Sequence, residues 1–266
     1  MAKLDVNGVK LNVQQLGAGR PVVFVHGLVM DNLSSWYFTV ANRVARSARA
    51  ILYDLRGHGM SERPPSGYRL DDMVSDLDGV VDGLDLDEPV TLIGNSFGGM
   101  LAVAYAAARP ERTAGLVLVD AHLSGPGWGD AMARTLELQG AQRDELIAET
   151  FKSWLGRHSR RKRSRLARNA AELVYDTTLV RDLRDSAELA DEALAAITCP
   201  VLAIYGQDSD ARIHGEHLAA VLPACELRLL PGCTHSVLWE ATESLRDAIA
   251  AWVDAPVPAA SHEGVG

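Results

Sequence analysis

The most informative stretch of this sequence is Val90-Thr91-Leu92-Ile93-Gly94-Asn95-Ser96-Phe97-Gly98-Gly99. Its first residues form an apolar run typical of a buried strand, and an Ala-rich helical pattern follows over residues 96–109. The two are joined by the motif G-x-S-x-G, whose glycines allow a sharp turn that exposes the serine oxygen. Backbone N–H groups at the start of the helix favour negative charge beside that oxygen. The pattern therefore predicts that Ser96 is a nucleophile rather than a helix cap.

Short apolar runs and helical patterns continue to alternate on both sides of this turn. Runs that are apolar on both faces are typical of buried parallel strands, and the segments between them are typical of crossover helices. Residues 10–15 instead alternate polar and apolar side chains, which predicts part of an antiparallel edge hairpin. We therefore expect an α/β fold with a mostly parallel sheet flanked by helices. The predicted strands cover residues 22–25, 50–53, 90–93, 116–119, 201–205 and 226–230, and the predicted helices cover residues 68–84, 96–109 and 240–253.

One long segment interrupts this alternation. Residues 121–198 contain several successive helical patterns and no convincing strand. An insertion at this point predicts a helical lid over the carboxyl ends of the strands, where open α/β sheets bind their ligands. The expected organisation is a core formed by residues 1–120 and 199–253, a lid formed by residues 121–198, and a disordered tail at residues 254–266.

Three features together resemble the α/β-hydrolase superfamily. The turn around Ser96 is similar to the family's nucleophile elbow, His26-Gly27 is similar to its HG loop, and residues 53–61 are similar to its D-x-R-G-x-G-x-S loop. The resemblance implies an oxyanion hole formed by the backbone N–H groups of Leu28 and Phe97, and a structural role for the D-x-R-G loop. Dehalogenases and epoxide hydrolases of this fold carry an aspartate at the elbow, so a serine there favours acyl transfer.

A serine hydroxyl needs a general base, and the resemblance assigns this role to His235. Histidine suits the task because its ordinary pKa lies near neutrality. His235 follows the predicted strand at residues 226–230, in the loop Pro231-Gly232-Cys233-Thr234-His235. The other seven histidines have structural interpretations. We place His26 and His58 in loop scaffolding, His122 and His158 in the lid, His214 and His217 on a surface helix, and His262 in the tail.

The acid that orients this base has three candidates. The family's usual position is the loop after the strand at residues 201–205, but Ser209 stands there, between Asp208 and Asp210. Some members use a second position after the preceding core strand, which Asp120 occupies here. A carboxylate at either position orients the imidazole and stabilises the imidazolium. We favour Asp120, with Asp210 and Asp208 as alternatives.

These residues support three functional hypotheses. The first is a serine hydrolase that cleaves an ester, lactone or thioester of a small to medium apolar acyl compound through an acyl-enzyme. The second is a carbon–carbon-bond hydrolase, or a cofactor-free lyase or perhydrolase, on the same residues. Asn95 is also found in carbon–carbon hydrolases of this superfamily, but their glycine-rich HG loop is replaced by Leu28-Val29-Met30. The third is a binding protein without turnover, which the intact elbow disfavours. We expect Asn95 and Trp36 to line the substrate pocket.

Composition limits the remaining classes. The chain of 266 residues is 47% hydrophobic and 23% charged, as expected of a globular enzyme. A formal net charge of −9 argues against nucleic acid as a partner. The chain shows no apolar leader, no apolar run of roughly 18 residues and no C-x-x-C spacing among its three cysteines, so we expect a cytoplasmic protein that does not bind membranes. The absence of metal-ligand and dinucleotide patterns predicts no metal and no cofactor.

A dense basic segment lies within the predicted lid. On an otherwise acidic protein it would suit an anionic partner, such as a phosphopantetheine-bearing acyl carrier or a coenzyme A thioester. A solvated helix face is the simpler interpretation. We therefore expect a small-molecule acyl substrate, with attachment to a carrier as an alternative. The basic residues are Arg157, Arg160, Arg161, Lys162, Arg163, Arg165 and Arg168.

Overall fold

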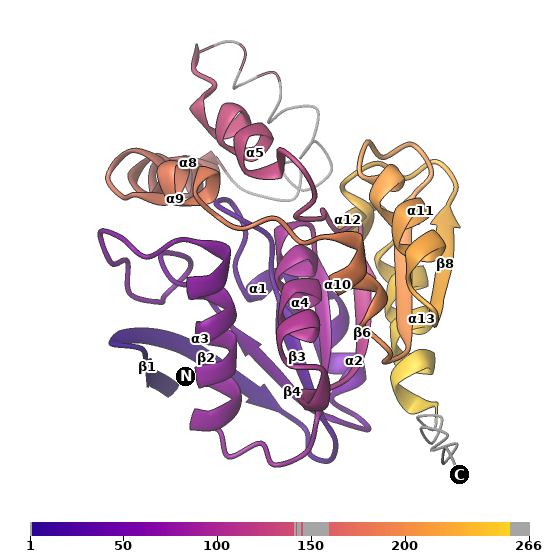
Figure 1. The fold of residues 1–266 in the computed structure, drawn as a ribbon. Helices are drawn as coiled ribbons and strands as arrows, with labels where there is room; N and C mark the ends of the chain where they lie inside the picture. Colours follow the sequence, from indigo (N-terminus) through magenta and orange to yellow (C-terminus); the bar gives the residue numbers. More distant parts are fainter. Residues whose placement is uncertain (1, 141, 143–144, 146–159, 256–266) are drawn as a thin grey trace.

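The chain forms an eight-stranded sheet in the order β1-β2-β4-β3-β5-β6-β7-β8 (Figure 1). The computed structural model describes residues 2–140, 142, 145 and 160–255. β2 pairs with β1 and with β4 in antiparallel fashion, and the remaining neighbours are parallel. The predicted α/β fold, with a mostly parallel sheet and an antiparallel edge hairpin, is therefore confirmed. The strands are β1 (Ala2–Val6), β2 (Val9–Leu16), β3 (Pro21–Val25), β4 (Arg49–Tyr53), β5 (Val90–Asn95), β6 (Thr113–Val119), β7 (Val201–Gly206) and β8 (Cys225–Leu230).

Helices cover both faces of this sheet. Alternate residues of a strand point to opposite faces, so a single strand contributes side chains to both. In β3, Val23 and Val25 belong to the core cluster on one face, whereas Val22 and Phe24 belong to the cluster on the other. The first face is covered by α3 (Leu70–Gly83), α4 (Phe97–Ala108) and α11 (Arg212–Val221). The second face is covered by α1 (Ser34–Trp36), η1 (Tyr37–Ala41), α2 (Asn42–Val44) and α13 (Thr242–Asp254).

The chain between β6 and β7 is helical, and its described residues contain no strand. Two of its helices, α5 (Trp128–Glu137) and α9 (Leu179–Arg184), pack closely, because Gly129 lies directly against the Leu183 carbonyl group. In Figure 1, α5, α9 and the helix α8 (Arg160–Tyr175) lie beyond one end of the sheet. The division of the chain into a core and a lid stays a prediction. Another helix of this insertion, α10 (Asp191–Ala195), precedes β7.

The C-terminal elements differ from the predicted ones in two places. The predicted helix at residues 240–253 is divided into α12 (Val237–Glu240) and α13. Asp254, which we assigned to the tail, belongs to α13, where its carboxylate accepts a hydrogen bond from Ser47 and lies 3.6 Å from Arg43. Residues 256–266 of the predicted tail lie outside the described residues. None of the described helices combines the length and the apolar character that a membrane span requires.

Candidate active site

Ser96 lies in a strained turn between β5 and α4. Its φ of 51° and ψ of −123° are unusual for a residue with a side chain, and such conformations cost on the order of 1–3 kcal/mol. The turn is tight because the chain passes very close to its neighbours. A Cβ on Gly98 would lie 2.3 Å from the Val25 carbonyl oxygen, and one on Gly94 would lie 2.4 Å from the Gly98 oxygen. The Ser96 N–H donates to the Val119 carbonyl (3.1 Å), which holds the turn against β6.

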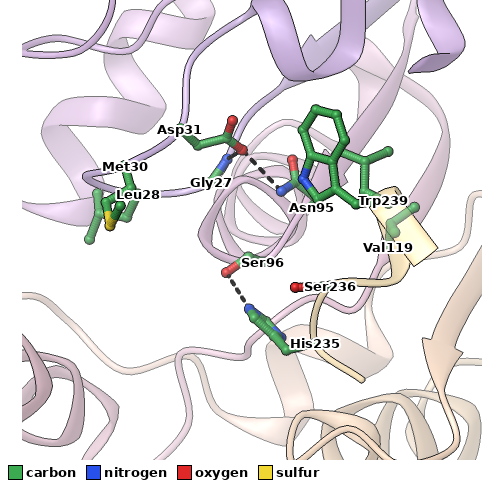
Figure 2. Close-up of a pocket in the computed structure, with 11 residues that line it drawn as sticks. Gly27, Leu28, Met30, Asp31, Asn95, Ser96, Val119, His235, Ser236 and Trp239 are labelled. Atoms are coloured by element: carbon green, nitrogen blue, oxygen red, sulfur yellow. Dashed lines mark hydrogen bonds between the residues drawn. The ribbon is translucent and has the colours of Figure 1, made fainter. Parts of the chain in front are cut away.

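His235 points its ring toward the Ser96 hydroxyl group (Figure 2). It lies in the loop between β8 and α12, with Nε2 3.1 Å from Ser96 Oγ and Nδ1 2.6 Å from Asp120 Oδ2. A carboxylate only accepts hydrogen bonds, so Nδ1 carries the proton and donates to Asp120. Nε2 is then free to accept the proton of the Ser96 hydroxyl group. This is the arrangement that a general base requires.

Asp120, at the end of β6, is the predicted acid that meets His235. Its carboxylate is 2% exposed and accepts further hydrogen bonds from the Gly206 N–H (2.8 Å) and the Ser209 hydroxyl group (2.5 Å). Asp208 and Asp210 are exposed, and within the described residues neither is hydrogen-bonded to His235. Ser209, which stands where the family usually has its acid, therefore supports the carboxylate of Asp120.

Of the two expected oxyanion donors, Phe97 directly follows Ser96, and Leu28 lines the same two cavities as Ser96. No described residue accepts a hydrogen bond from the backbone N–H of Leu28 or of Phe97. Leu28 begins a three-residue turn in which the Met30 N–H donates to the Leu28 carbonyl (2.8 Å) and Val29 has a φ of 64°. Unpaired N–H groups next to a nucleophile are suited to a developing oxyanion. Their role remains a proposal.

Two buried histidines hold the HG loop in place. His58 Nε2 accepts a hydrogen bond from the Val29 N–H (2.7 Å), and His26 Nε2 accepts one from the Leu55 N–H (3.0 Å). The opposite nitrogens, Nδ1, lie 2.8 Å from the Arg56 carbonyl and 2.7 Å from the Gly27 carbonyl, respectively. Burial lowers the pKa of His58 to about 3, so the neutral ring persists at physiological pH. Both residues have the scaffolding contacts expected from the sequence.

A small cavity of about 50 Å³ adjoins Ser96 and His235 on one side (Figure 2). The carboxylate of Asp31 forms part of its wall and accepts hydrogen bonds from the Gly27 N–H (2.9 Å) and from Asn95 Nδ2 (3.1 Å). Asn95 lines this cavity, and its buried Oδ1 has no hydrogen-bond partner among the residues that the structure describes. The predicted pocket residue Asn95 thus lies beside the nucleophile, with its amide nitrogen already bound to a carboxylate.

A second, much larger cavity of about 1360 Å³ also opens onto Ser96 and His235. It lies between the sheet and the helices of the insertion, and its walls differ in character. Apolar side chains from α4, α5 and α8 form one side, including Met100, Trp128 and Met132. Polar side chains form another part of the wall, and these are His122, Asp191, Glu192, Asp210, His214 and His217.

One interpretation of the sequence needs correction. Trp36 does not line either cavity; it is 0% exposed, packs beside Phe24 and donates from Nε1 to the Val25 carbonyl (3.0 Å). His214 and His217 lie on a surface helix, as predicted, and both also line the large cavity. The sequence carried a signal for this location, because α11 begins shortly after the carboxyl end of β7.

The basic segment is described in part. Arg157 and the side chains of Arg160 and Lys162 lie outside the described part of the structure. Arg161, Arg163, Arg165 and Arg168 are exposed, and Arg163 also lines the large cavity. Binding of a carrier therefore stays a prediction.

The chain belongs to the α/β-hydrolase family, because the family model described as alpha/beta hydrolase fold matches residues 20–242. It is 40% identical over 117 residues to a 2-hydroxy-6-oxo-2,4-heptadienoate hydrolase of Pseudomonas putida, covering 43% of this chain and 42% of that protein. The match thus spans about two fifths of that relative. It is 28% identical to the AB hydrolase superfamily protein YisY of Bacillus subtilis, over 91% of this chain and 94% of that protein.

Solved structures show the same fold. Est816, described as an N-acyl homoserine lactone degrading enzyme, superposes with a TM-score of 0.71 at 25% identity, covering 94% of this chain and 100% of that chain. The resemblance predicted from the elbow, the HG loop and the D-x-R-G loop is therefore confirmed at the level of family and fold.

Proposed function

We propose that this protein is a serine hydrolase that cleaves an ester, lactone or thioester of a small to medium apolar acyl compound. The observation that carries the proposal is the hydrogen-bonded series Asp120–His235–Ser96, whose histidine and serine line a large, partly apolar cavity. A serine, a base within hydrogen-bond reach and an acid that orients the base are the elements of nucleophilic acyl transfer.

The proposed reaction has two halves. In the first, His235 Nε2 takes the hydroxyl proton while Ser96 Oγ attacks the scissile carbonyl, and the Leu28 and Phe97 N–H groups bind the oxyanion. His235 then gives this proton to the leaving oxygen or sulfur atom, which leaves an acyl-enzyme. In the second half, water repeats the attack with His235 as base and releases the acid and free Ser96. Asp120 stabilises the imidazolium ion in both halves.

A carbon–carbon hydrolase is the second candidate, and it is favoured by the similarity to the heptadienoate hydrolase. The carboxylate of Asp31 favours the proposed ester, lactone or thioester hydrolase over a carbon–carbon hydrolase. It lies beside Ser96 and occupies the amide nitrogen of Asn95, so a dienoate anion bound there would meet a like charge. Turnover of a ring-fission dienone at a rate comparable to that of simple esters would reverse this preference.

The test of serine activation is covalent labelling. We expect a fluorophosphonate probe to modify Ser96 of the wild-type protein, as located by peptide mass, and to leave both Ser96→Ala and His235→Ala unmodified. Hydrolysis of p-nitrophenyl esters should fall in parallel by about 10³-fold or more. Full retention of ester turnover by folded Ser96→Ala would refute the proposed nucleophile. Labelling of wild type without turnover of esters or dienones would point to a different bond type.

A further inference from the structure

A row of histidine rings extends from His235 along the wall of the large cavity. The ring of His122 lies 5.0 Å from that of His235, centroid to centroid, and 5.6 Å from that of His214. His122 follows β6 closely, and its N–H donates to the Ser96 carbonyl (3.2 Å), which ties its position to the nucleophile. The proposed reaction does not use His122 or His214.

These two rings are neutral hydrogen-bonding groups. Burial lowers the pKa of His122 to about 3, and burial also lowers the pKa of His214. No described residue is hydrogen-bonded to the ring nitrogens of either histidine. Among the described residues, no group of three or more histidine, cysteine or carboxylate side chains is arranged to hold a metal ion. Each ring is thus available to donate or accept one hydrogen bond inside the cavity.

The charges around this row are negative. Asp210, Asp191 and Glu192 line the same cavity, and Asp191 is hydrogen-bonded to His217 (2.8 Å). Within the described lining the one cation is Arg163, which lies on α8. In Figure 1, α8 and α11 are on opposite sides of α4. A carboxylate on the substrate would therefore meet like charges on the α11 side, at a cost that neutral groups do not incur.

We propose that His122 and His214 bind a neutral hydrogen-bonding group that the substrate carries a few bonds from its scissile carbonyl, and that the carboxylates beside them exclude anionic substrates. The inference deepens the proposed function and rests on it. It describes an amphipathic acyl compound, whose polar group faces α11 while its apolar part packs against α4, α5 and α8. A buried polar wall rejects analogues that leave its hydrogen bonds unmade.

Three methyl esters of matched shape test this specificity. Methyl succinamate has a neutral amide three bonds from the scissile carbonyl, monomethyl succinate has a carboxylate at that place, and methyl 4-methylpentanoate has an isopropyl group. For the wild-type protein we expect kcat/KM to be highest for the amide and lowest for the carboxylate. The carboxylate should be slower than the amide by about tenfold or more.

Variants separate the two parts of the inference. His214→Phe keeps a ring against His122 but removes its hydrogen bonds, so the ratio of amide to isopropyl ester should fall by roughly fivefold. Asp210→Asn removes one charge, so the ratio of carboxylate to isopropyl ester should rise by about fivefold. Asp208→Asn is the control, because it makes the same charge change two residues away, outside the described cavity lining. It should leave all three rates unchanged.

Binding to folded Ser96→Ala, measured by NMR titration of the same esters, separates this inference from the proposed function. The order amide, isopropyl, carboxylate supports the inference even if the wild type hydrolyses none of them, in which case the proposed function fails alone. Hydrolysis with equal binding of all three overturns the inference and leaves the function intact. A preference for the carboxylate that disappears in Arg163→Gln also overturns it.

Discussion

At the scale of single residues, backbone strain gathers around the proposed reacting atoms. In the described part of the chain, five residues other than glycine have a positive φ, and Val29, Ser96 and Asp120 are three of them. Each of these three residues comes after the end of a strand, at the edge of the sheet that carries the candidate active site. Hydrogen bonds to neighbouring strands hold two of them, since the Ser96 N–H donates to Val119 and the Asp120 N–H donates to Ile204. The sheet thus stabilises conformations that the residues would otherwise avoid, and these conformations aim the side chains.

Replacement of Asp120, the proposed acid, should strongly reduce the rate of hydrolysis. In Asp120→Asn we expect kcat for an activated ester to fall by about 10³–10⁴-fold, because the amide neither stabilises an imidazolium nor keeps the proton on His235 Nδ1. Steady-state kinetics of folded variants would measure this, with Asp208→Asn as the matched control. A small loss in Asp120→Asn together with a large one in Asp210→Asn would transfer the role to Asp210.

At the scale of elements, the contact between the start of α4 and the end of β3 positions the nucleophile. Gly98 lies in the first turn of α4, directly against the Val25 and His26 carbonyl groups. A side chain at Gly98 would meet rigid backbone rather than a flexible neighbour, so the helix would have to move away from the sheet.

Gly98→Ala tests this contact. Helix propensity alone would stabilise the variant by about 1 kcal/mol. The clash should outweigh this gain, and we expect a net loss of about 1–3 kcal/mol in the free energy of unfolding, with reduced ester turnover. Chemical denaturation of Gly98→Ala and of Gly125→Ala, whose added Cβ would meet open space, makes the comparison. Equal stability of the two variants would show that the contact is loose.

At the scale of the whole molecule, buried neutral histidines couple folding to pH. Burial lowers the pKa of His58 and of His122 to about 3 in the folded chain. An unfolded histidine titrates near pH 6.5. Below that pH the unfolded chain binds protons that the folded chain does not, so stability falls as the pH decreases from about 6.5 toward 3.

For His58 this linkage corresponds to about 2 kcal/mol of stability lost between pH 7.5 and pH 5. His58→Gln retains an acceptor for the Val29 N–H but does not titrate. Between pH 7.5 and pH 5, this variant should therefore lose about 2 kcal/mol less stability than the wild type. Urea denaturation at both pH values measures the difference, and an unchanged pH dependence would contradict the assignment.

Much of the fold and part of the site follow from local sequence patterns. Apolar runs, helical periodicity and the G-x-S-x-G turn depend on neighbours in the chain, so they predicted the sheet, the crossover helices and the position of Ser96. His235 was also predictable, because it stands in the loop after the last strand, where the resembled family has its base. Such signals are carried by spacing along the chain and need no knowledge of how distant segments meet.

The remaining features depend on how distant segments pack. Whether Asp120, Asp208 or Asp210 meets His235 depends on three loops that converge at one edge of the sheet, and the hydrogen bonds from Gly206 and Ser209 hold Asp120 there. Trp36 points into the core instead of the pocket for the same kind of reason. The sequence determined which residues are chemically able to act. Only the tertiary structure decided which of them face one another, because the direction of a side chain is set by the elements packed around it.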